Sequence, residues 1–444
     1  MASTPEEWLA LLTKKLDARQ PKIARLRQYS TGNAPMPEMG KNTKASWEAF
    51  QKKARTDMGG LLCSSLAGRM VPNGVRVGDV SASPAITALQ KVWRDNRLAV
   101  VFADAIWNAL SVSYGYLVTG IRDGEPMITS EQPEQMIVAP DPVQPWRSRA
   151  ALKAWRDEDA EVDYAYVWVP GMRQRYTRKS KNEGGSYRNT SQGGWEPQGE
   201  PETYAGPLPV YELANAHGVA EFEPHIDVID RINLGKLQRL VVTAMQAYKQ
   251  RAMKGGLPEK DEEGNDIDWA KVFEPAPGAL WDLPIGIDVW ESQSTDIRPL
   301  LDGEKTDLRD FAAVTQSPID VFIPDGQNQS ATGAANVHKG EIMKAKDRIA
   351  RFTAPMEGAL LAALRILDLD DGSTVQVLWE PPEHVSLSEK SSAAKLAKDA
   401  GKTQRWIDQH IWGMRPDEIA QEESDRAEEQ LAAAILVGAA SGNA

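Results

Sequence analysis

Residues 317–352 constrain the fold of this chain more than any other segment. They begin with an apolar, strand-like piece from Ile319 to Ile323, which runs into the turn formers Pro324-Asp325-Gly326. A loop of small and amide side chains follows without a charged residue, and after it the sequence predicts a long helix. Uncharged amides and hydroxyls suit brief contact with a surface that slides past. The candidate contact residues of this loop are Gln327, Asn328, Gln329, Ser330 and Thr332.

Long helices are also predicted on both sides of this loop. Apolar residues recur at spacings of three and four over residues 224–254, which predicts a helix about 45 Å long. Residues 257–296 hold turn formers and short apolar runs, and they predict a small, mostly non-helical module. Further helices are predicted over 299–316 and over 332–366, the second with a kink at Pro355.

The first half of the chain mixes helices with strands. Helices are predicted over residues 5–31, with an interruption near Pro21, and over 46–71 and 84–114. The Asp123-Gly124 pair predicts the turn of a β-hairpin. The predicted strands cover residues 75–80, 114–121, 126–129, 135–139, 150–156, 163–169, 172–178 and, later in the chain, 374–380.

Two segments are predicted from their composition and position. Residues 179–206 are polar and rich in Gly, Ser and Asn, which predicts a mobile surface loop. The tail over 386–437 is predicted to be helical, and the closing GAASGNA to be disordered. Runs of helices separated from antiparallel hairpins are typical of an α+β fold, which is the class we expect.

The net charge of −12 limits what this 444-residue chain can do with nucleic acid. Proteins that grip DNA usually carry a basic surplus, whereas this surface should repel DNA, which argues against a repressor or a polymerase-like role. No apolar run reaches the roughly 18 residues that a membrane helix needs, and the start lacks the apolar core of a signal peptide, so we expect no export. The single cysteine, Cys63, lies in an apolar stretch that predicts inert packing.

Motifs for catalysis, metals and cofactors fail on their spacing. Ala400-Gly401-Lys402-Thr403 looks like the end of a phosphate-binding loop, but Leu396 stands where the first glycine is required, so a helix C-cap is predicted instead. Asp368 to Gly372 begins like a calcium loop, yet Trp379 stands where a bidentate glutamate is required, so a turn is predicted. The five histidines show no ligand spacing. We expect no catalytic residue, no metal and no cofactor.

In their order along the chain, these elements resemble the portal proteins of tailed bacteriophages, in particular those of siphophages with long non-contractile tails. The resemblance spans nearly the whole chain and is best at the loop and helix from Gln329 to Phe352. It also rests on Ile226-Asp227, which opens the long helix, and on the helix and hairpin from Trp107 to Glu131. Tyr29 and Gly32 resemble the loop that follows the N-terminal helix of that family.

The resemblance implies a subunit with four regions, a wing, a stem of two long helices, a clip and a helical crown. The loop at 324–333 would then project into a channel and touch DNA. The implied boundaries are 1–223 for the first part of the wing, 224–254 and 297–316 for the stem helices, 255–296 for the clip, 317–384 for the tunnel loop, tunnel helix and rest of the wing, and 385–444 for the crown.

The resemblance also implies the partners. Such a subunit would form a homo-oligomeric ring, usually of twelve copies, at one vertex of the capsid in the virion, after assembly in the host cytoplasm. The implied partners are double-stranded DNA without sequence preference, the terminase large subunit, a head–tail adaptor, and the major capsid and scaffold proteins. No membrane partner is implied.

Basic residues on the predicted helices are candidates for charges that face the channel. They can make weak, salt-sensitive contacts with phosphates, or simply balance acids on a solvated face. The candidates are Lys236, Arg239, Lys249, Lys254, Lys339 and Lys344. Two other classes stay open, a different ring or adaptor protein of a phage head and a soluble enzyme with scattered catalytic carboxylates. A monomer with a deep polar cleft would favour the enzyme.

Overall fold

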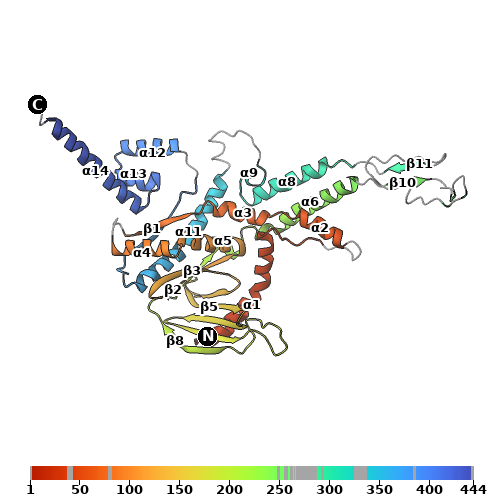
Figure 1. The fold of residues 1–444 in the computed structure, drawn as a ribbon, viewed down its shortest axis with the longest axis horizontal. Helices are drawn as coiled ribbons and strands as arrows, with labels where there is room; N and C mark the ends of the chain where they lie inside the picture. The colour runs from red at the N-terminus through yellow and green to blue at the C-terminus, as the bar shows by residue number, and fades with distance from the viewer. Residues whose placement is uncertain are drawn as a thin grey trace. The chain divides into compact units, whose positions relative to one another are not determined.

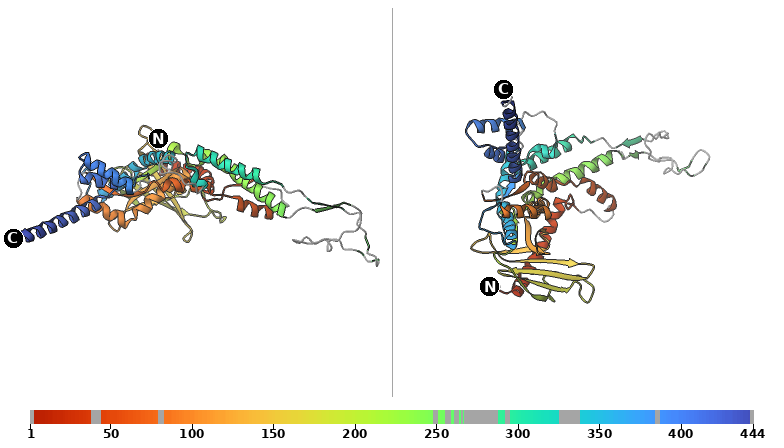
Figure 2. Two further views of the ribbon diagram at one scale, coloured as in Figure 1. Left: turned by 90° about the horizontal axis from the view of Figure 1, so that it is seen from above. Right: turned by 60° about the vertical axis from the view of Figure 1, so that its left-hand side comes forward.

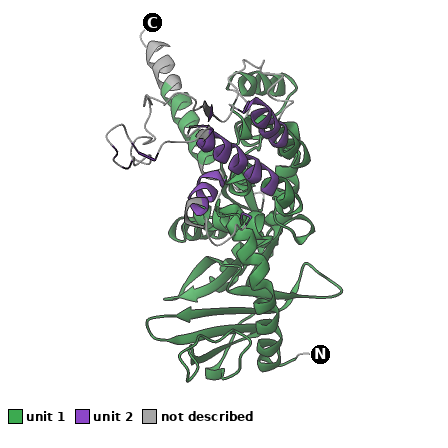
Figure 3. Cartoon of the chain, turned by 90° about the vertical axis from the view of Figure 1, so that its right-hand side faces the viewer, with its two compact units in different colours: residues 1–35, 56–229, 309–444 green, residues 36–55, 230–308 purple. Residues whose placement is uncertain are grey.

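The chain folds into two compact units in the computed structural model, which combines helices with antiparallel sheets (Figure 1). Unit 1 comprises residues 1–35, 56–229 and 309–444, and unit 2 comprises residues 36–55 and 230–308 (Figure 3). This mixture confirms the predicted α+β class. The structure describes residues 3–37, 44–78, 83–247, 251–254, 259–260, 264, 266, 288–291, 295–324, 338–383 and 387–441. Within these ranges, no helix has the length and apolar character needed to cross a membrane.

Helix α1 packs its apolar face on a five-stranded antiparallel sheet in unit 1. The helix starts with a capping box in which Thr4 and Glu7 bond to each other's backbone N–H. The predicted interruption at Pro21 is wrong, because Leu16 and Ile23 are buried on either side of it and hold both halves in one helix. The elements are α1 (Pro5–Ser30) and, in sheet order, β4 (Met136–Pro140), β5 (Ser148–Asp157), β6 (Val162–Val169), β7 (Met172–Lys179) and β8 (Glu196–Thr203), which confirms the strands predicted between 135 and 178.

A second, three-stranded sheet contains the predicted hairpin. Its two turn residues, Asp123 and Gly124, have φ angles of 54° and 82°, the left-handed conformation that a two-residue hairpin turn requires. Tyr116 of this sheet and Trp168 of β6 belong to one buried cluster, so the two sheets share a core. The strands, in the order β3-β2-β9, are β2 (Tyr114–Arg122), β3 (Glu125–Glu131) and the unpredicted β9 (Val210–Ala214).

The segment 179–206, predicted as a mobile loop, is held by side-chain contacts and contains strand β8. The guanidinium of Arg178 is almost fully buried and lies 2.9 Å from Asp163, with which it forms an ion pair. The same guanidinium donates a hydrogen bond to the carbonyl of Asn189 at 2.7 Å. The prediction failed because composition shows the polarity of the segment but not the buried arginine beneath it.

Two predicted helices are each divided in two. The helix predicted over 46–71 breaks before Asp57, whose side chain caps the second part by accepting from the Gly60 N–H at 2.7 Å. The helix predicted over 84–114 breaks at Arg97, which has a left-handed φ of 53°. The parts are α2 (Lys44–Ala54), α3 (Met58–Ala67), α4 (Pro84–Asp95) and α5 (Leu98–Val112).

The strands predicted at 75–80 and 374–380 pair with each other in antiparallel fashion. They are β1 (Pro72–Val77) and β12 (Val375–Trp379).

The apolar piece from Ile319 to Ile323 is a helical turn and not a strand. This turn is α9 (Ile319–Phe322), and it places the ring of Phe322 5.1 Å from that of Phe311, edge to face, in the core of unit 1. A strand would alternate these side chains, whereas the turn lets Phe322 fill the core. The later helix, α11 (Lys339–Ile366), contains Pro355, and the predicted helix start at 332 lies outside the described residues.

The C-terminal segment is helical, as predicted. Gly401 has a φ of 79° after one helix and Thr403 caps the next, so residues 400–403 form the predicted helix boundary. Residues 368–372 form the predicted turn before β12, in which the side chain of Asp370 accepts from the N–H of Gly372. The predicted disorder is wrong up to Ser441, because the Ala-rich end continues the helix. The elements are α12 (Leu387–Asp399), α13 (Gln404–Ile407), the π-helical turn η4 (Asp408–Trp412) and α14 (Pro416–Ser441).

Most of α6 and α8 belongs to unit 2, and the two helices lie side by side as an antiparallel pair in Figures 1 and 2. The helix predicted over 224–254 is shorter, because its last residues form strand β10 (Arg251–Lys254), paired with β11 (Asp288–Glu291). At 22 residues, α6 (Ile226–Ala247) is about 33 Å long. The other helix, α8 (Arg298–Val314), confirms the one predicted at 299–316. Most of the predicted module at 257–296 lies outside the described residues.

Candidate functional site

The predicted channel loop, with Gln327, Asn328, Gln329, Ser330 and Thr332, lies outside the described residues. The structure describes the two segments of unit 1 that border it, α9 before it and the start of α11 after it. The side chains that hold α11 in unit 1 therefore define the base of the candidate site.

The first turn of α11 is held by Glu341, which is 2% exposed. Its carboxylate accepts hydrogen bonds from the hydroxyl of Ser65, in the last turn of α3, and, at 2.5 Å, from Nε of Arg69, two residues beyond α3. Arg69 also donates to the carbonyl of Pro382 at 3.1 Å. A buried carboxylate needs such partners, so this Glu341 cluster (Glu341, Ser65 and Arg69) fixes the start of α11 against α3.

His338 connects the two segments that border the loop. Nη2 of Arg69 lies 2.9 Å from Nδ1 of His338, and because a guanidinium can only donate, Nδ1 accepts in the neutral ring. The hydrogen is then on Nε2, which faces Oδ2 of Asp320 on α9 at 3.4 Å. The imidazole of His338, the residue before α11, thus links the start of α11 to α9.

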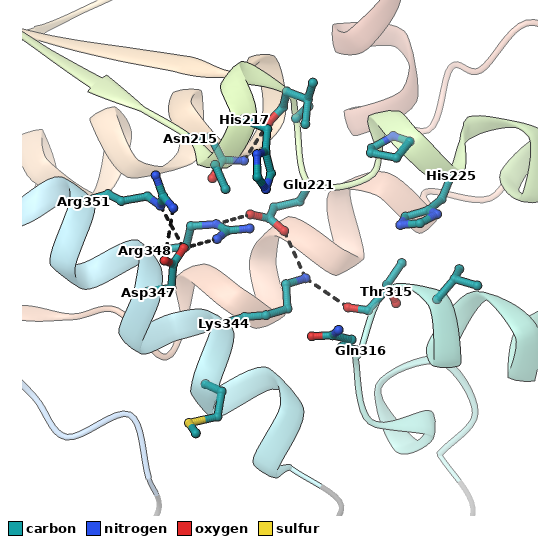
Figure 4. Close-up of a pocket in the computed structure, with 16 residues that line it drawn as sticks. Asn215, His217, Glu221, His225, Thr315, Gln316, Lys344, Asp347, Arg348 and Arg351 are labelled. Carbon is teal, nitrogen blue, oxygen red and sulfur yellow. Dashed lines mark hydrogen bonds and ion pairs between the residues drawn. The ribbon is translucent and has the colours of Figure 1, made fainter. Parts of the chain in front are cut away.

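One turn further along, Glu221 holds α11 a second time (Figure 4). Glu221 is 7% exposed and lies between the short 3₁₀ helices η2 (Ala216–Gly218) and η3 (Glu223–His225). Nζ of Lys344 is 3.0 Å from its Oε2, and Nε of Arg348 is 2.6 Å from its Oε1. Lys344 and Arg348 are four residues apart, so both lie on one face of the helix. We call these three residues the Glu221 cluster.

The electrostatics of the Glu221 cluster favour the ionised carboxylate. Burial alone would raise the pKa of Glu221, but the charges of Lys344 and Arg348 and their hydrogen bonds outweigh it and hold the pKa below its usual 4.5. Lys344 donates a further bond to the carbonyl of Thr315 at 3.0 Å, just beyond the end of α8. The cluster therefore connects three segments of unit 1 that are far apart in the sequence.

A cavity of about 470 Å³ lies beside this cluster in unit 1. Its wall includes His217, His225, Gln316 and Arg351 (Figure 4). Burial, assisted by the charge of Lys344, lowers the pKa of His225 and so favours the neutral ring. Among the described residues, no group of three or more His, Cys, Asp or Glu side chains could hold a metal ion. The arrangement is one of paired charges that position a helix.

The predicted channel charges lie in different surroundings. Lys344 belongs to the Glu221 cluster, and Lys339 and Lys254 are exposed. In unit 2, Nζ of Lys236 lies 3.5 Å from Oε1 of Glu304, and Nε of Arg239 lies 3.1 Å from its Oε2. Both basic residues of α6 thus face a single carboxylate of α8. Lys249 lies outside the described residues.

No pattern in the sequence singles out Glu221 and Glu304, the carboxylates that pair with these basic residues, or Glu341, which pairs with Arg69. The i, i+4 spacing of Lys344 and Arg348 indicates a shared helix face, but their partner lies more than a hundred residues earlier in the chain.

Comparisons with known proteins give a match over most of the chain. The family model described as "Phage portal protein, SPP1 Gp6-like" matches residues 10–435. Among solved structures, the chain is similar to one in "Neck of native GTA particle computed with C12 symmetry", with 13% identity over 88% of this chain and 98% of that chain and a TM-score of 0.47. It is also similar to one in "Virion of native gene transfer agent (GTA) particle", with 12% identity over 89% of this chain and 99% of that chain and a TM-score of 0.45. No curated relative matches the chain.

Proposed function

Because the chain belongs to the SPP1 Gp6-like family of phage portal proteins, we propose that it forms a ring-shaped channel at one vertex of a capsid. Double-stranded DNA would enter, be retained and leave through this channel. The observation that carries the proposal is the family match, which extends over residues 10–435. The role is physical, since the subunit guides a polymer and performs no reaction on it.

The proposed stem consists of α6 and α8, with a clip beyond them. Support comes from unit 2, where the two helices run antiparallel and share Glu304 through Lys236 and Arg239. Nε2 of Gln246 also donates to the carbonyl of Thr295 at 2.6 Å, which joins the ends of the helices next to the β10–β11 pair. The proposed regions keep the boundaries of the sequence prediction, with the wing at 1–223 and 317–384, the stem at 224–254 and 297–316, the clip at 255–296 and the crown at 385–444.

The proposed DNA contact is the loop at 324–333, in which the residues from 327 to 333 carry no charge and include Gln327, Asn328, Gln329, Ser330 and Thr332. Two features support it. The Glu341 and Glu221 clusters fix the first turns of α11, which gives a loop at this place a rigid base. The net charge of −12 also disfavours adhesion of a polyanion, so uncharged side chains would touch DNA without holding it.

The proposed partners follow from a ring at a capsid vertex. A homo-oligomer, most often a dodecamer in this family, would bind the terminase large subunit during packaging and a head–tail adaptor afterwards. The major capsid and scaffold proteins would surround it. We place the protein at the portal vertex of the virion, and in the host cytoplasm during assembly.

The loop assignment is tested by replacing residues 327–330 with four glycines. We expect rings to assemble as before, while the DNA content of purified particles falls. A control replaces Glu183 and Ser186 of the exposed turn 183–186 in unit 1, whose other two residues are already glycine, by glycine and should leave both rings and DNA content unchanged. Particles of the loop variant with the parental amount of DNA would contradict the assignment.

A further inference from the structure

The loop between β4 and β5 exposes two large apolar side chains at its tip. Val143 is 82% exposed and Trp146 is 80% exposed, the two highest values among the large apolar side chains of the described residues. Leaving an indole and an isopropyl group in water forfeits the stabilisation that their burial would give. Such a loop is therefore a candidate for a contact with another molecule.

This loop is fixed in shape before any contact is made. Oδ1 of Asp141 accepts hydrogen bonds from the backbone N–H groups of Val143 at 2.8 Å and Gln144 at 2.9 Å, and these two bonds lower the pKa of Asp141. The N–H of Asp141 donates to the carbonyl of Arg147 at 2.8 Å, which closes the loop. Because the backbone is already ordered, binding through Trp146 costs little conformational entropy.

A cavity that suits such a side chain lies in the same unit. It has a volume of about 340 Å³, and its wall includes Ile121, Trp168, Tyr204 and Pro207. Its volume is near the lower limit of about 300–1,000 Å³ for ligand pockets, so it fits one or two side chains better than a cofactor. The hydroxyl of Tyr204 donates to the carbonyl of Val169 at 2.6 Å, which fixes this wall in place.

The rim of the cavity favours an aromatic guest. Arg173 and Arg365 both line it, and a guanidinium attracts the face of an indole ring. Glu202 lies on the same rim, where it is paired with Arg173, so the rim as a whole is basic. Loop and cavity are thus complementary in apolar surface and in the attraction between guanidinium groups and an indole ring.

The loop and this part of the rim lie toward opposite edges of the five-stranded sheet. The loop follows β4, which is one edge strand, whereas Arg173 and Glu202 belong to β7 and to the other edge strand, β8. Strands are about 4.8 Å apart, so β4 and β8 are about 19 Å apart across the sheet. A closed ring uses a head-to-tail interface, in which two different surfaces of each subunit meet.

We propose that Val143 and Trp146 of each subunit insert into the cavity at Trp168 and Tyr204 of a second copy of this chain, the next subunit of the ring. This contact rests on the proposed function, because it requires a ring. It assigns the contact between neighbouring wings to the tip of the β4–β5 loop on one subunit and to one cavity on the next.

The test places one cysteine on each surface of the same chain, Pro145→Cys, which is exposed beside the retained Trp146, and Ala205→Cys, and adds a short bismaleimide to assembled rings. Ala205 is exposed and lines the cavity, while the native Cys63 is fully buried and should not react. We expect a ladder of covalent oligomers on a denaturing gel, up to the subunit number of the ring. A mixture of the two single variants should give covalent dimers only, because each link then uses the one introduced cysteine of both subunits.

A matched control joins Leu387→Cys, which is 73% exposed on α12, with Ala205→Cys and should give no ladder. The single change Trp146→Ser should weaken each interface about 30-fold, as expected for an interface hot spot, and so reduce the fraction of subunits in rings. Rings in electron micrographs that give no ladder, together with unchanged assembly of Trp146→Ser, would overturn the contact and leave the portal function standing. An absence of rings in the parent protein would overturn both.

Discussion

Replacing Glu221 by glutamine should loosen the first half of α11 while the rest of unit 1 stays folded. The substitution keeps the size of the side chain but removes the charge that faces Lys344 at 3.0 Å and Arg348 at 2.6 Å. The two cationic side chains are only 15% and 12% exposed, so they would remain largely buried without their counter-charge. Removal of one partner of a buried ion pair costs about 3–5 kcal/mol.

We expect a cost at the lower end of that range, about 3 kcal/mol, because some contacts remain. Lys344 keeps its bond to the carbonyl of Thr315, and Arg348 keeps its ion pair with Asp347. Amide hydrogen exchange of the backbone at 339–351 measures this local opening directly. A loss of 3 kcal/mol corresponds to exchange about 150-fold faster in this segment.

A matched control, which removes another carboxylate that pairs with α11, is Glu383→Gln. Glu383 pairs with Lys346 of α11 at 2.5 Å, but the two side chains are 37% and 53% exposed, so the loss should stay below about 1 kcal/mol. Equal exchange rates in the two variants would refute the reasoning that the Glu221 cluster fixes α11.

The same comparison has a defined pH dependence. The pKa of Glu221 is lowered in the folded state, so its contribution to stability is fully present above the ordinary value of 4.5. That contribution is lost as the pH falls through the lowered pKa. The difference in exchange between parent and Glu221→Gln should therefore be constant near neutral pH and shrink below about pH 4.5.

Three further predictions concern other parts of the molecule. Asp163→Asn should destabilise unit 1 by about 3 kcal/mol, measured as a lower urea midpoint, because it leaves the buried Arg178 without its counter-charge. Burial raises the pKa of Asp163, but its arginine and serine partners outweigh this effect and lower the pKa, so the loss of stability should shrink in acid. Glu304→Gln should speed hydrogen exchange in the α6–α8 pair, and the effect should persist in high salt, since Lys236 and Glu304 are only 18% and 15% exposed. Cys63, whose pKa burial raises well above 9.0, should resist a thiol reagent until the protein unfolds, and rapid labelling of the native protein would contradict its burial.

Local signals in the sequence predicted the local structure well. The Asp123-Gly124 turn, the strands between 135 and 178 and the helix boundary at 400–403 were predicted correctly, because each depends on residues close together in the chain. The family was identified from the order of elements, and the match over 10–435 confirms it.

The predictions that failed depend on distant partners. The segment 179–206 was predicted to be mobile because nothing in its own composition reveals the buried Arg178, which donates a hydrogen bond to the carbonyl of Asn189 in this segment. The strand expected at 319–323 is a helical turn because Phe322 packs on Phe311. The Glu221 cluster could not be predicted, since its carboxylate and its two cations are separated by more than a hundred residues.

Native mass spectrometry of the purified protein, with electron micrographs of the same sample, tests the central claim most directly. A ring-forming portal subunit predicts a single large assembly of about twelve copies with a central hole, consistent with head-to-tail closure. A stable dimer or tetramer without a hole would contradict the claim that this chain forms a channel for DNA.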